Sequence, residues 1–167
     1  VATKPLFNLA TKARVDLSAP PALFRYDEDV PAPSKRRSSA TVAFSSSNVV
    51  EWDWDGTRWV RQLDGAPMLS ESGAEVAVDN IVIQEVVVTE SDILDVTGFP
   101  SPEVELLGEG RAWVLRDGRL VVGRWRRDSL GDVTVFETRA GEEIALAPGT
   151  TFVELVPKDA GEATFGR

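Results

Sequence analysis

The chain has 167 residues, a net charge of −9, no cysteine and no histidine, and 43% of its residues are hydrophobic. Without cysteine and histidine, disulfides, thiolate catalysis, a Ser-His-Asp triad and imidazole metal sites are excluded. The negative charge argues against broad nucleic-acid binding, which needs a basic surface, and no apolar run approaches the roughly 20 residues of a membrane-spanning helix. We therefore expect one globular domain with no metal, cofactor or nucleic-acid partner.

Residues 1–40 differ in composition from the rest of the chain. They contain several prolines and a basic, serine-rich run, Ser34–Ser39. Because proline fixes φ and lacks a backbone donor, this segment is predicted to be an extended connector. Leu23, Phe24 and Tyr26 are expected to hold part of it against the body, and the tip at Lys35–Ser39 is expected to be mobile. Since Val1 stands first, we expect a fragment whose targeting segment, if any, lies upstream.

The next part of the chain alternates with a period of two. Val50, Trp52 and Trp54 alternate with Glu51 and Asp53, which is typical of a half-buried strand. The return strand is expected after the Asp55-Gly56 turn, and the β-branched run Ile81–Val88 predicts a buried strand. Gly98, Pro100 and Pro102 favour a loop over Thr89–Pro102.

The segment Leu107–Asp128 predicts a β-hairpin around Asp117-Gly118, because both residues of this two-residue turn need positive φ. In that register Leu115 faces Leu120, and Gly110 lies opposite Trp125. Apolar residues then occupy both faces of the hairpin, one with Trp113, Leu115, Leu120 and Val122, the other with Val114, Val121 and Trp125. A hairpin that is apolar on both faces must lie in the interior of a sheet.

Three more strands are predicted at Val133–Thr138, Glu143–Leu146 and Thr151–Val156, and residues 158–167 are expected to form a polar, frayed tail. The chain thus divides into an arm at 1–40, a β domain at 41–157 and the tail. About eight to ten short strands with turns every 8–12 residues predict an all-β fold, either an antiparallel β-sandwich or a partly closed barrel, with a Pro-rich N-terminal arm.

A family resemblance is carried by the order and spacing of several short motifs. They are Val50-x-Trp52-x-Trp54-Asp55, Trp59-x-Arg61, Asp79–Ile83, Gly108-x-Gly110-x-Ala112, Asp117-Gly118, Gly123-x-Trp125, Gly141-x-x-Ile144 and Pro148-Gly149. From about Pro21 to Pro157 the chain resembles the C-terminal domain of YerB-like lipoproteins of Gram-positive bacteria, a family of unknown function. Phe152 stands where tryptophan is usual, and Arg126-Arg127 where lysine is common.

The resemblance implies a two-domain protein that is exported and tethered to the membrane by an upstream lipidated cysteine. It also implies that residues 1–20 are the end of the missing N-terminal domain or the link to it. The family supplies no catalytic residues, and we assign none here.

Six arginines lie within residues 108–127, against two acidic residues, so the local charge is +6 − 2 = +4. A row of guanidinium groups can hold the phosphates of an anionic wall polymer, lipid headgroups or an acidic partner. The alternative is that the arginines protect sheet edges and pair with acidic neighbours. We take Arg111, Arg119, Arg124 and Arg126 as the candidate binding residues.

Tryptophans and carboxylates provide the other candidates. Trp54 and Trp59, beside the Asp55-Gly56 turn, are the pair expected to be exposed for stacking on a sugar, although tryptophan is more often a core residue. Glu51, Asp53 and Asp55 cluster on and after one strand, and Asp53-x-Asp55-Gly56 resembles the start of a calcium loop. A solvated strand face explains Glu51 and Asp53 more simply. Two carboxyl groups could also act on a glycosidic bond, but this would need a cleft in which the pKa of one of them is raised.

The sequence therefore favours a non-catalytic, extracytoplasmic interaction domain of a membrane-anchored envelope lipoprotein. Its expected partner is an envelope protein, an anionic wall polymer or its own N-terminal domain. The alternatives are an accessory enzyme or binding module that acts on envelope glycans through carboxylates and exposed tryptophans, and a domain that only supports its N-terminal neighbour.

Overall fold

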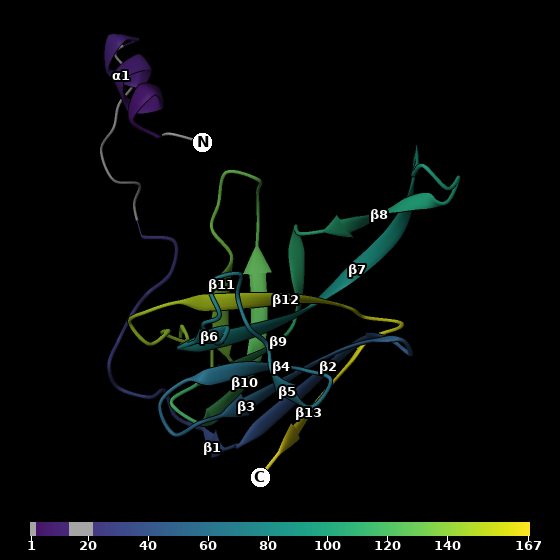
Figure 1. The fold of residues 1–167 in the computed structure, drawn as a ribbon. Coiled ribbons are helices and arrows are strands. Elements are labelled where there is room, and N and C mark those ends of the chain that lie inside the picture. The colour runs from purple at the N-terminus through teal and green to yellow at the C-terminus, as the bar shows by residue number, and fades with distance from the viewer. Residues whose placement is uncertain (1–2, 14–21) are drawn as a thin grey trace.

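The structure, a computed structural model, describes residues 3–13 and 22–167, which form one short helix and two β-sheets (Figure 1). The helix is α1, Lys4–Lys12. The strands of the first sheet are β1 (Lys35–Arg36), β7 (Asn80–Leu94), β8 (Pro100–Glu105), β9 (Gly108–Arg116), β10 (Arg119–Arg127), β11 (Val135–Thr138) and β12 (Thr151–Pro157). Those of the second are β2 (Ser39–Ser45), β3 (Asn48–Trp54), β4 (Trp59–Leu63), β5 (Ala66–Pro67), β6 (Ala77–Val78) and β13 (Glu162–Gly166).

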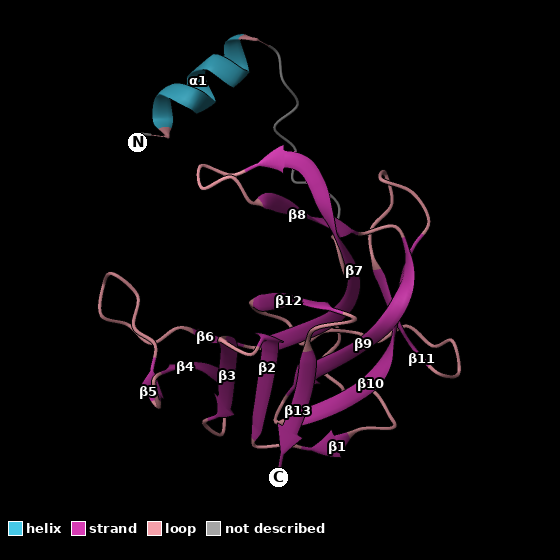
Figure 2. Ribbon diagram, turned by 90° about the vertical axis from the view of Figure 1, so that its right-hand side faces the viewer, coloured by secondary structure: helices cyan, strands magenta, loops and turns pink. Residues whose placement is uncertain are grey.

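The first sheet has the strand order β1-β10-β9-β7-β12, with β11 also paired to β10 and β8 to β7. The second has the order β13-β2-β3-β4-β5, with β6 paired to β4. Figure 2 shows the first sheet curled like part of a barrel, with the second sheet against one of its ends. The predicted all-β class is confirmed. No helix in the described part of the chain is both long and apolar enough to cross a membrane.

The central hairpin has the predicted register. Leu120 pairs with Leu115 and Trp125 with Gly110, and the turn residues Asp117 and Gly118 have φ of 52° and 63°. The Trp125 indole covers the bare backbone of Gly110, where an added Cβ would lie 2.5 Å from Nε1. That Nε1 donates to the carbonyl of Glu85 at 2.7 Å. The hairpin lies between β7 and β11, as its two apolar faces require.

The two faces of the hairpin enter two separate cores. Trp113, Leu115 and Leu120 pack into the core between the sheets, with Trp52 and Trp59 from the second sheet. On the other face a second core fills the inside of the curled sheet, with members Val82, Val86, Ala112, Val114, Val121, Trp125, Phe136, Ile144 and Leu146. The sequence pattern that is apolar on both faces thus corresponds to a sheet with a core on each side.

One strand pair runs parallel, which the antiparallel prediction did not include. Residues Asn80–Val86 pair in parallel with Thr151–Pro157. The buried Asn80 side chain donates to the carbonyl of Ala147 at 2.9 Å and accepts from the Ala147 N–H at 2.7 Å. Asp79 accepts from the N–H of Thr150 at 2.7 Å. These contacts fix the start of β12 beside the start of β7, so both strands run in the same direction.

Two segments expected to lack regular structure are strands. Residues 89–102 belong largely to the β7–β8 hairpin, in which a bulge between Glu90 and Leu94 accommodates the irregular pairing. The prediction of a frayed tail is also wrong, because β13 pairs with β2 and Phe165 packs against the inter-sheet core. Ala163 and Phe165 alternate with polar residues and both pack against this core, but an alternation over so few positions is too short to predict a strand.

The arm is attached to the body by backbone and side-chain contacts. Phe24 packs against Phe136 in the second core, with ring centroids 5.8 Å apart, as expected. The buried Arg116 donates to the carbonyls of Glu28 at 3.0 Å and Ala145 at 3.1 Å. Leu23, by contrast, is 61% exposed, so it does not hold the arm. The predicted Pro20-Pro21 segment falls outside the described residues.

Candidate functional site

The six predicted binding residues separate into three places. Arg119 and Trp54 line the same pocket. Arg111, Arg124 and Arg126 lie further along β9 and β10, and Trp59 is in the inter-sheet core. The pocket has a volume of about 610 Å³, and its lining residues are Arg36, Arg37, Ser38, Trp54, Gly56, Asp117, Gly118, Arg119 and Arg167. We call this the arginine pocket.

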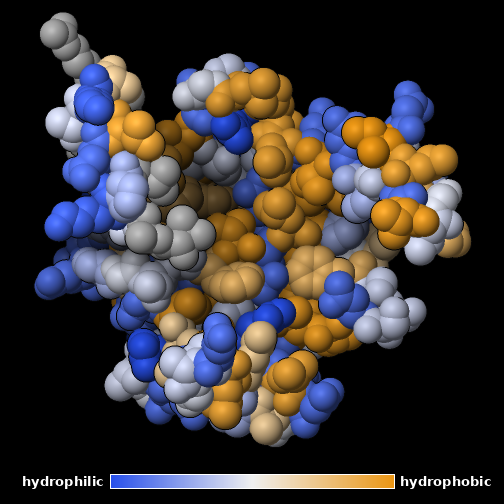
Figure 3. Space-filling model, turned by 45° about the horizontal axis from the view of Figure 1, so that its top comes forward, coloured by the Kyte–Doolittle hydropathy of each residue, from blue (hydrophilic) through white to orange (hydrophobic). Residues whose placement is uncertain are grey.

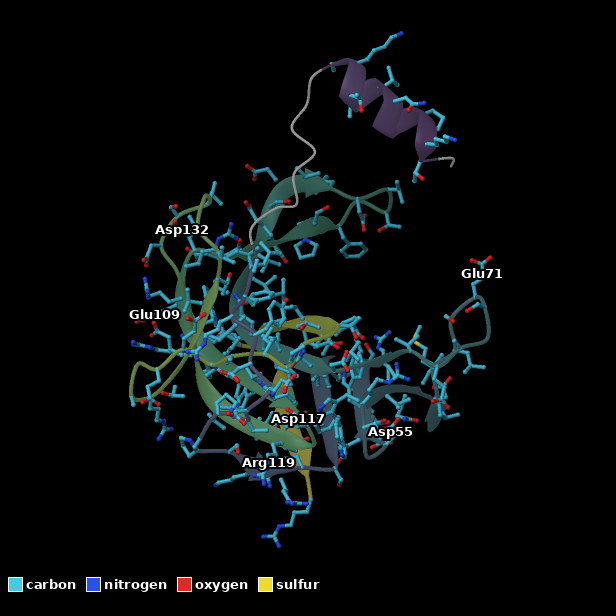
Figure 4. The ribbon with its side chains drawn as sticks, turned by 90° about the vertical axis from the view of Figure 1, so that its left-hand side faces the viewer. Asp55, Glu71, Glu109, Asp117, Arg119 and Asp132 are labelled. Carbon is cyan, nitrogen blue, oxygen red and sulfur yellow. The ribbon has the colours of Figure 1, made fainter. Side chains whose placement is uncertain are left out.

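Segments that are distant in sequence form the arginine pocket at one end of the sandwich. The N–H of Arg37 donates to the carbonyl of Gly118 at 2.9 Å, and that of Trp54 to the carbonyl of Ser38 at 2.8 Å. Arg37 and Ser38, directly after β1, therefore lie between the end of β3 and the hairpin turn. Figure 4 shows Asp117 and Arg119 at this end of the molecule, away from Glu109 and Asp132.

Trp54 forms a rigid wall of the arginine pocket. Its half-buried indole lies on Gly118, where an added Cβ would be 2.8 Å from Nε1. On the core side its ring centroid is 5.3 Å from that of Trp59, at an interplanar angle of 55°. Since both sides of the ring are supported, the exposed part of Trp54 is preorganised as an apolar surface.

The arginines of the pocket carry unneutralised charge. No ion pair among the described residues includes Arg36, Arg37, Arg119 or Arg167. Asp117 is the acidic side chain in the lining, and its carboxylate accepts from Arg116 Nε at 2.7 Å. Arg119 makes one long contact, from Nη1 to Ser34 Oγ at 3.4 Å. Arg37 Nη1 also donates to the carbonyl of Arg36 at 2.8 Å. On a chain of net charge −9, the arginine pocket is a local concentration of guanidinium groups without ion pairs.

The other three predicted arginines are paired with acids, which matches the alternative reading of the arginine row. Arg111 lies 3.7 Å from Glu85, and its guanidinium is stacked 4.6 Å from the ring centroid of Trp113. Arg124 donates to Glu137 at 3.0 Å. Arg126 pairs with Asp128, whose hydrogen bond and charge raise the pKa of Arg126, and also lies 3.7 Å from Glu137.

The expected exposure of Trp59 is wrong. Its side chain is 0% exposed, because β4 turns it into the inter-sheet core beside Trp54 and opposite Val78. A buried ring offers no face to a sugar. Of the expected stacking pair, Trp54 alone lines a pocket, so a platform of two tryptophans at this turn is excluded.

The acidic residues Glu51, Asp53 and Asp55 belong to the exposed face of a strand and to the turn that follows it. Glu51 and Asp53 are exposed on β3, as expected. The Asp55 carboxylate accepts from the N–H groups of Arg58 and Thr57, both at 2.7 Å, and these bonds lower the pKa of Asp55. Its oxygens thus stabilise the turn. In the described ranges, no three acidic side chains gather as metal ligands.

Arg36, Arg37 and Arg167 were missed as site residues. The basic run Lys35-Arg36-Arg37 is visible in the sequence, but its composition predicts a mobile tip. Strand β1 instead pairs Arg36 with Arg119 on β10. This non-local pair brings two basic segments together and creates the arginine pocket, and a local pattern does not reveal it.

The family of the chain follows from its similarity to known proteins. Residues 40–153 match the family described as "Protein of unknown function (DUF3048) C-terminal domain". No curated protein matches the chain. The crystal structure of YerB protein from Bacillus subtilis is similar, with a TM-score of 0.70 and 20% sequence identity, over 98% of this chain and 54% of that one. This chain therefore spans about half the length of YerB, and it belongs to the DUF3048 C-terminal domain family as a YerB-like domain of unknown function.

Proposed function

We propose that this domain is a non-catalytic binding module that holds a phosphate-bearing polymer in the arginine pocket. The observation that carries the proposal is the set of guanidinium groups without ion pairs in a concave site of a strongly acidic chain. Free guanidinium groups are well suited to phosphate, because their planar donors form two parallel hydrogen bonds with its oxygens.

The composition of the pocket supports binding of a phosphodiester chain with a polyol or sugar backbone. Arg36, Arg37 and Arg119 would contact the phosphates, and the fixed edge of Trp54 would contact the carbon backbone between them. Among the described residues that line the pocket, Asp117 is the acidic side chain, and it is bonded to Arg116, so they supply no pair of free carboxylates for acid–base catalysis. This arrangement favours binding over the glycan-hydrolysing alternative.

The proposal extends to location and partner. We place the domain outside the cytoplasm, as part of a membrane-anchored lipoprotein of the cell envelope. The support is the resemblance to YerB-like lipoproteins and the fact that the chain spans 54% of the YerB chain, which leaves room for a further domain in a protein of that kind. In that setting an anionic wall polymer is the partner whose chemistry fits the arginine pocket, ahead of an envelope protein or the protein's own N-terminal domain.

The test is calorimetric titration of the domain with purified poly(glycerol phosphate). The pocket variant combines Arg36→Gln and Arg119→Gln. The control combines Arg124→Gln and Arg126→Gln, so both proteins have a net charge of −9 − 2 = −11. We expect the pocket variant to bind at least tenfold more weakly than the wild type and the control to retain its affinity, with binding that weakens as salt is added. Equal losses in both variants, or no binding by the wild type, would contradict the proposal.

A further inference from the structure

The end of the β7–β8 hairpin exposes a group of large apolar side chains. Ile93, Leu94, Val96 and Phe99 are 71%, 61%, 105% and 70% exposed. The hairpin projects from the body in Figure 1, and apolar side chains gather at the same corner, the upper right, in Figure 3. We call these four residues the hairpin tip. Clusters of this kind on a surface mark interaction sites more often than isolated apolar residues do.

The hairpin tip is held in one conformation by its turn. The Asp95 carboxylate accepts from the N–H of Thr97 at 2.8 Å, from its hydroxyl at 2.7 Å and from the N–H of Phe99 at 3.0 Å. At the base, Ser91 Oγ donates to the carbonyl of Ser101 at 2.9 Å. The apolar residues are therefore presented on a preformed loop, which lowers the entropic cost of docking.

The negative charge around the hairpin tip limits the kind of surface that it can bind. Residues 90–105 contain five acidic side chains and no lysine or arginine. An anionic membrane surface would repel this hairpin. An apolar hollow with a basic rim would complement both its apolar side chains and its negative charge.

The same chain carries such a hollow. Beside β10, between β1 and the end of β11, lies a groove of about 410 Å³, called the β10–β11 groove below, that includes the apolar Pro33, Leu120 and Val122, the basic Lys35 and Arg139, and one acid, Glu142. Val122 is 44% exposed there, and it lies between the part of β10 that pairs with β1 and the part that pairs with β11. Among the described residues Lys35 and Arg139 form no ion pair.

The topology prevents the tip from filling the groove of its own molecule. The hairpin tip continues from β7 and β8 on one side of the first sheet, and the groove lies at β10, β11 and β1 on the other side. We propose that the hairpin tip of one copy docks into the β10–β11 groove of a second copy. This contact is head-to-tail, so a bound pair still offers one free tip on one copy and one free groove on the other, and association continues into chains or closes into a ring.

The experiment is sedimentation velocity of the purified domain from micromolar to millimolar concentration. The tip variant carries Val96→Asp and Phe99→Ser, and the groove variant carries Val122→Glu. The matched control is Leu130→Ser, which changes a 76%-exposed apolar residue elsewhere. We expect concentration-dependent association of the wild type and the control, and at least tenfold weaker association of each variant alone.

Mixing the variants tests the head-to-tail geometry. The tip variant keeps an intact groove and the groove variant keeps an intact tip, so their mixture should form a one-to-one dimer that grows no further. Arg139→Glu, at an exposed position, provides a second groove variant should Val122→Glu fail to fold. A wild type that stays monomeric throughout, or association that survives the tip variant, would overturn the proposal. So would a mixture that remains monomeric.

Discussion

At the scale of single residues, Glu154 is a buried carboxylate between the sheets that the sequence did not single out. It is 5% exposed and accepts from Trp52 Nε1 at 3.1 Å. Burial raises the pKa of Glu154, and the Trp52 hydrogen bond and the nearby Arg61 oppose this only in part. A carboxyl that binds its proton more tightly in the folded than in the unfolded state makes the folded state less stable as the pH rises from its ordinary pKa through its raised pKa.

We therefore predict that Glu154→Gln removes this loss of stability. Gln keeps an oxygen that can accept from Trp52 but carries no charge. The free energy of unfolding of the variant should match that of the wild type below the ordinary carboxyl pKa and exceed it at neutral pH. Urea denaturation of both proteins across this pH range is the measurement. Two parallel pH profiles would show that Glu154 does not titrate in the folded protein with a raised pKa.

Arg116 is a buried cation that joins the arm to the sheet. Its side chain is 1% exposed and donates to two backbone carbonyls and to Asp117. Arg116→Met keeps much of the side-chain volume but leaves the Glu28 and Ala145 carbonyls without this donor. We predict a loss of about 2–4 kcal/mol in the free energy of unfolding.

The control for Arg116 is Arg124→Met, because Arg124 is 51% exposed and its ion pairs are screened by water. That change should cost no more than about 1 kcal/mol in the same denaturation experiment. Similar losses for the two substitutions would mean that the buried arginine is not what holds the arm.

At the scale of elements, the β9–β10 hairpin links the fold to the site, since its turn supports Trp54. Gly118→Ala would force a side chain into backbone at φ +63° and place a Cβ 2.8 Å from Trp54 Nε1. We predict a loss of about 1–2 kcal/mol or more, with a shift in tryptophan fluorescence as the indole is displaced.

Gly56→Ala provides the matched control for the turn. Gly56 also has positive φ, +105°, but an added Cβ would meet nothing within 4 Å. This control should be destabilised through its backbone alone and should leave the fluorescence of Trp54 unchanged. An equal fluorescence change in both variants would contradict the placement of the Trp54 ring on the hairpin turn.

Local elements could be predicted from the sequence, and pairs between distant segments could not. The Asp117-Gly118 turn fixes the register of its own strands, and the alternation at Val50, Trp52 and Trp54 reflects burial on one side of β3. The parallel pairing of β12 depends on the Asn80 side chain, which leaves no periodic pattern, and β13 is marked only by the short alternation of Ala163 and Phe165. The sequence therefore predicts the all-β class but not the strands at the edges of the sheets.

The same distinction applies to the candidate site. Arg119 and Trp54 were recognised by residue type, but their neighbours Arg36 and Arg37 come from the arm, which the sequence assigned to a connector. Arg111, Arg124 and Arg126 have the same residue type, and the acids Glu85 and Glu137 that pair with these three are on other strands. Strand pairing decides which arginines lie beside an acid and which form no ion pair. This can therefore be seen only in the folded chain.

At the scale of the whole molecule, the two cores hold the first sheet from both sides, and the arginine pocket lies at one end of this rigid assembly. A site built on such a scaffold needs little rearrangement to bind. The account therefore predicts that a ligand changes the environment of the pocket residues and leaves the strands that carry it unchanged.

The most direct test is nuclear magnetic resonance of the labelled domain titrated with poly(glycerol phosphate) oligomers. The indole N–H of Trp54, the Nε–H signals of Arg36 and Arg119 and the amides of Gly56 and Gly118 should shift together and saturate. The indole signals of Trp113 and Trp125 should stay in place. Shifts centred on Arg111 and Arg124, or no saturable shift at the pocket, would contradict the assignment of the arginine pocket as the binding site.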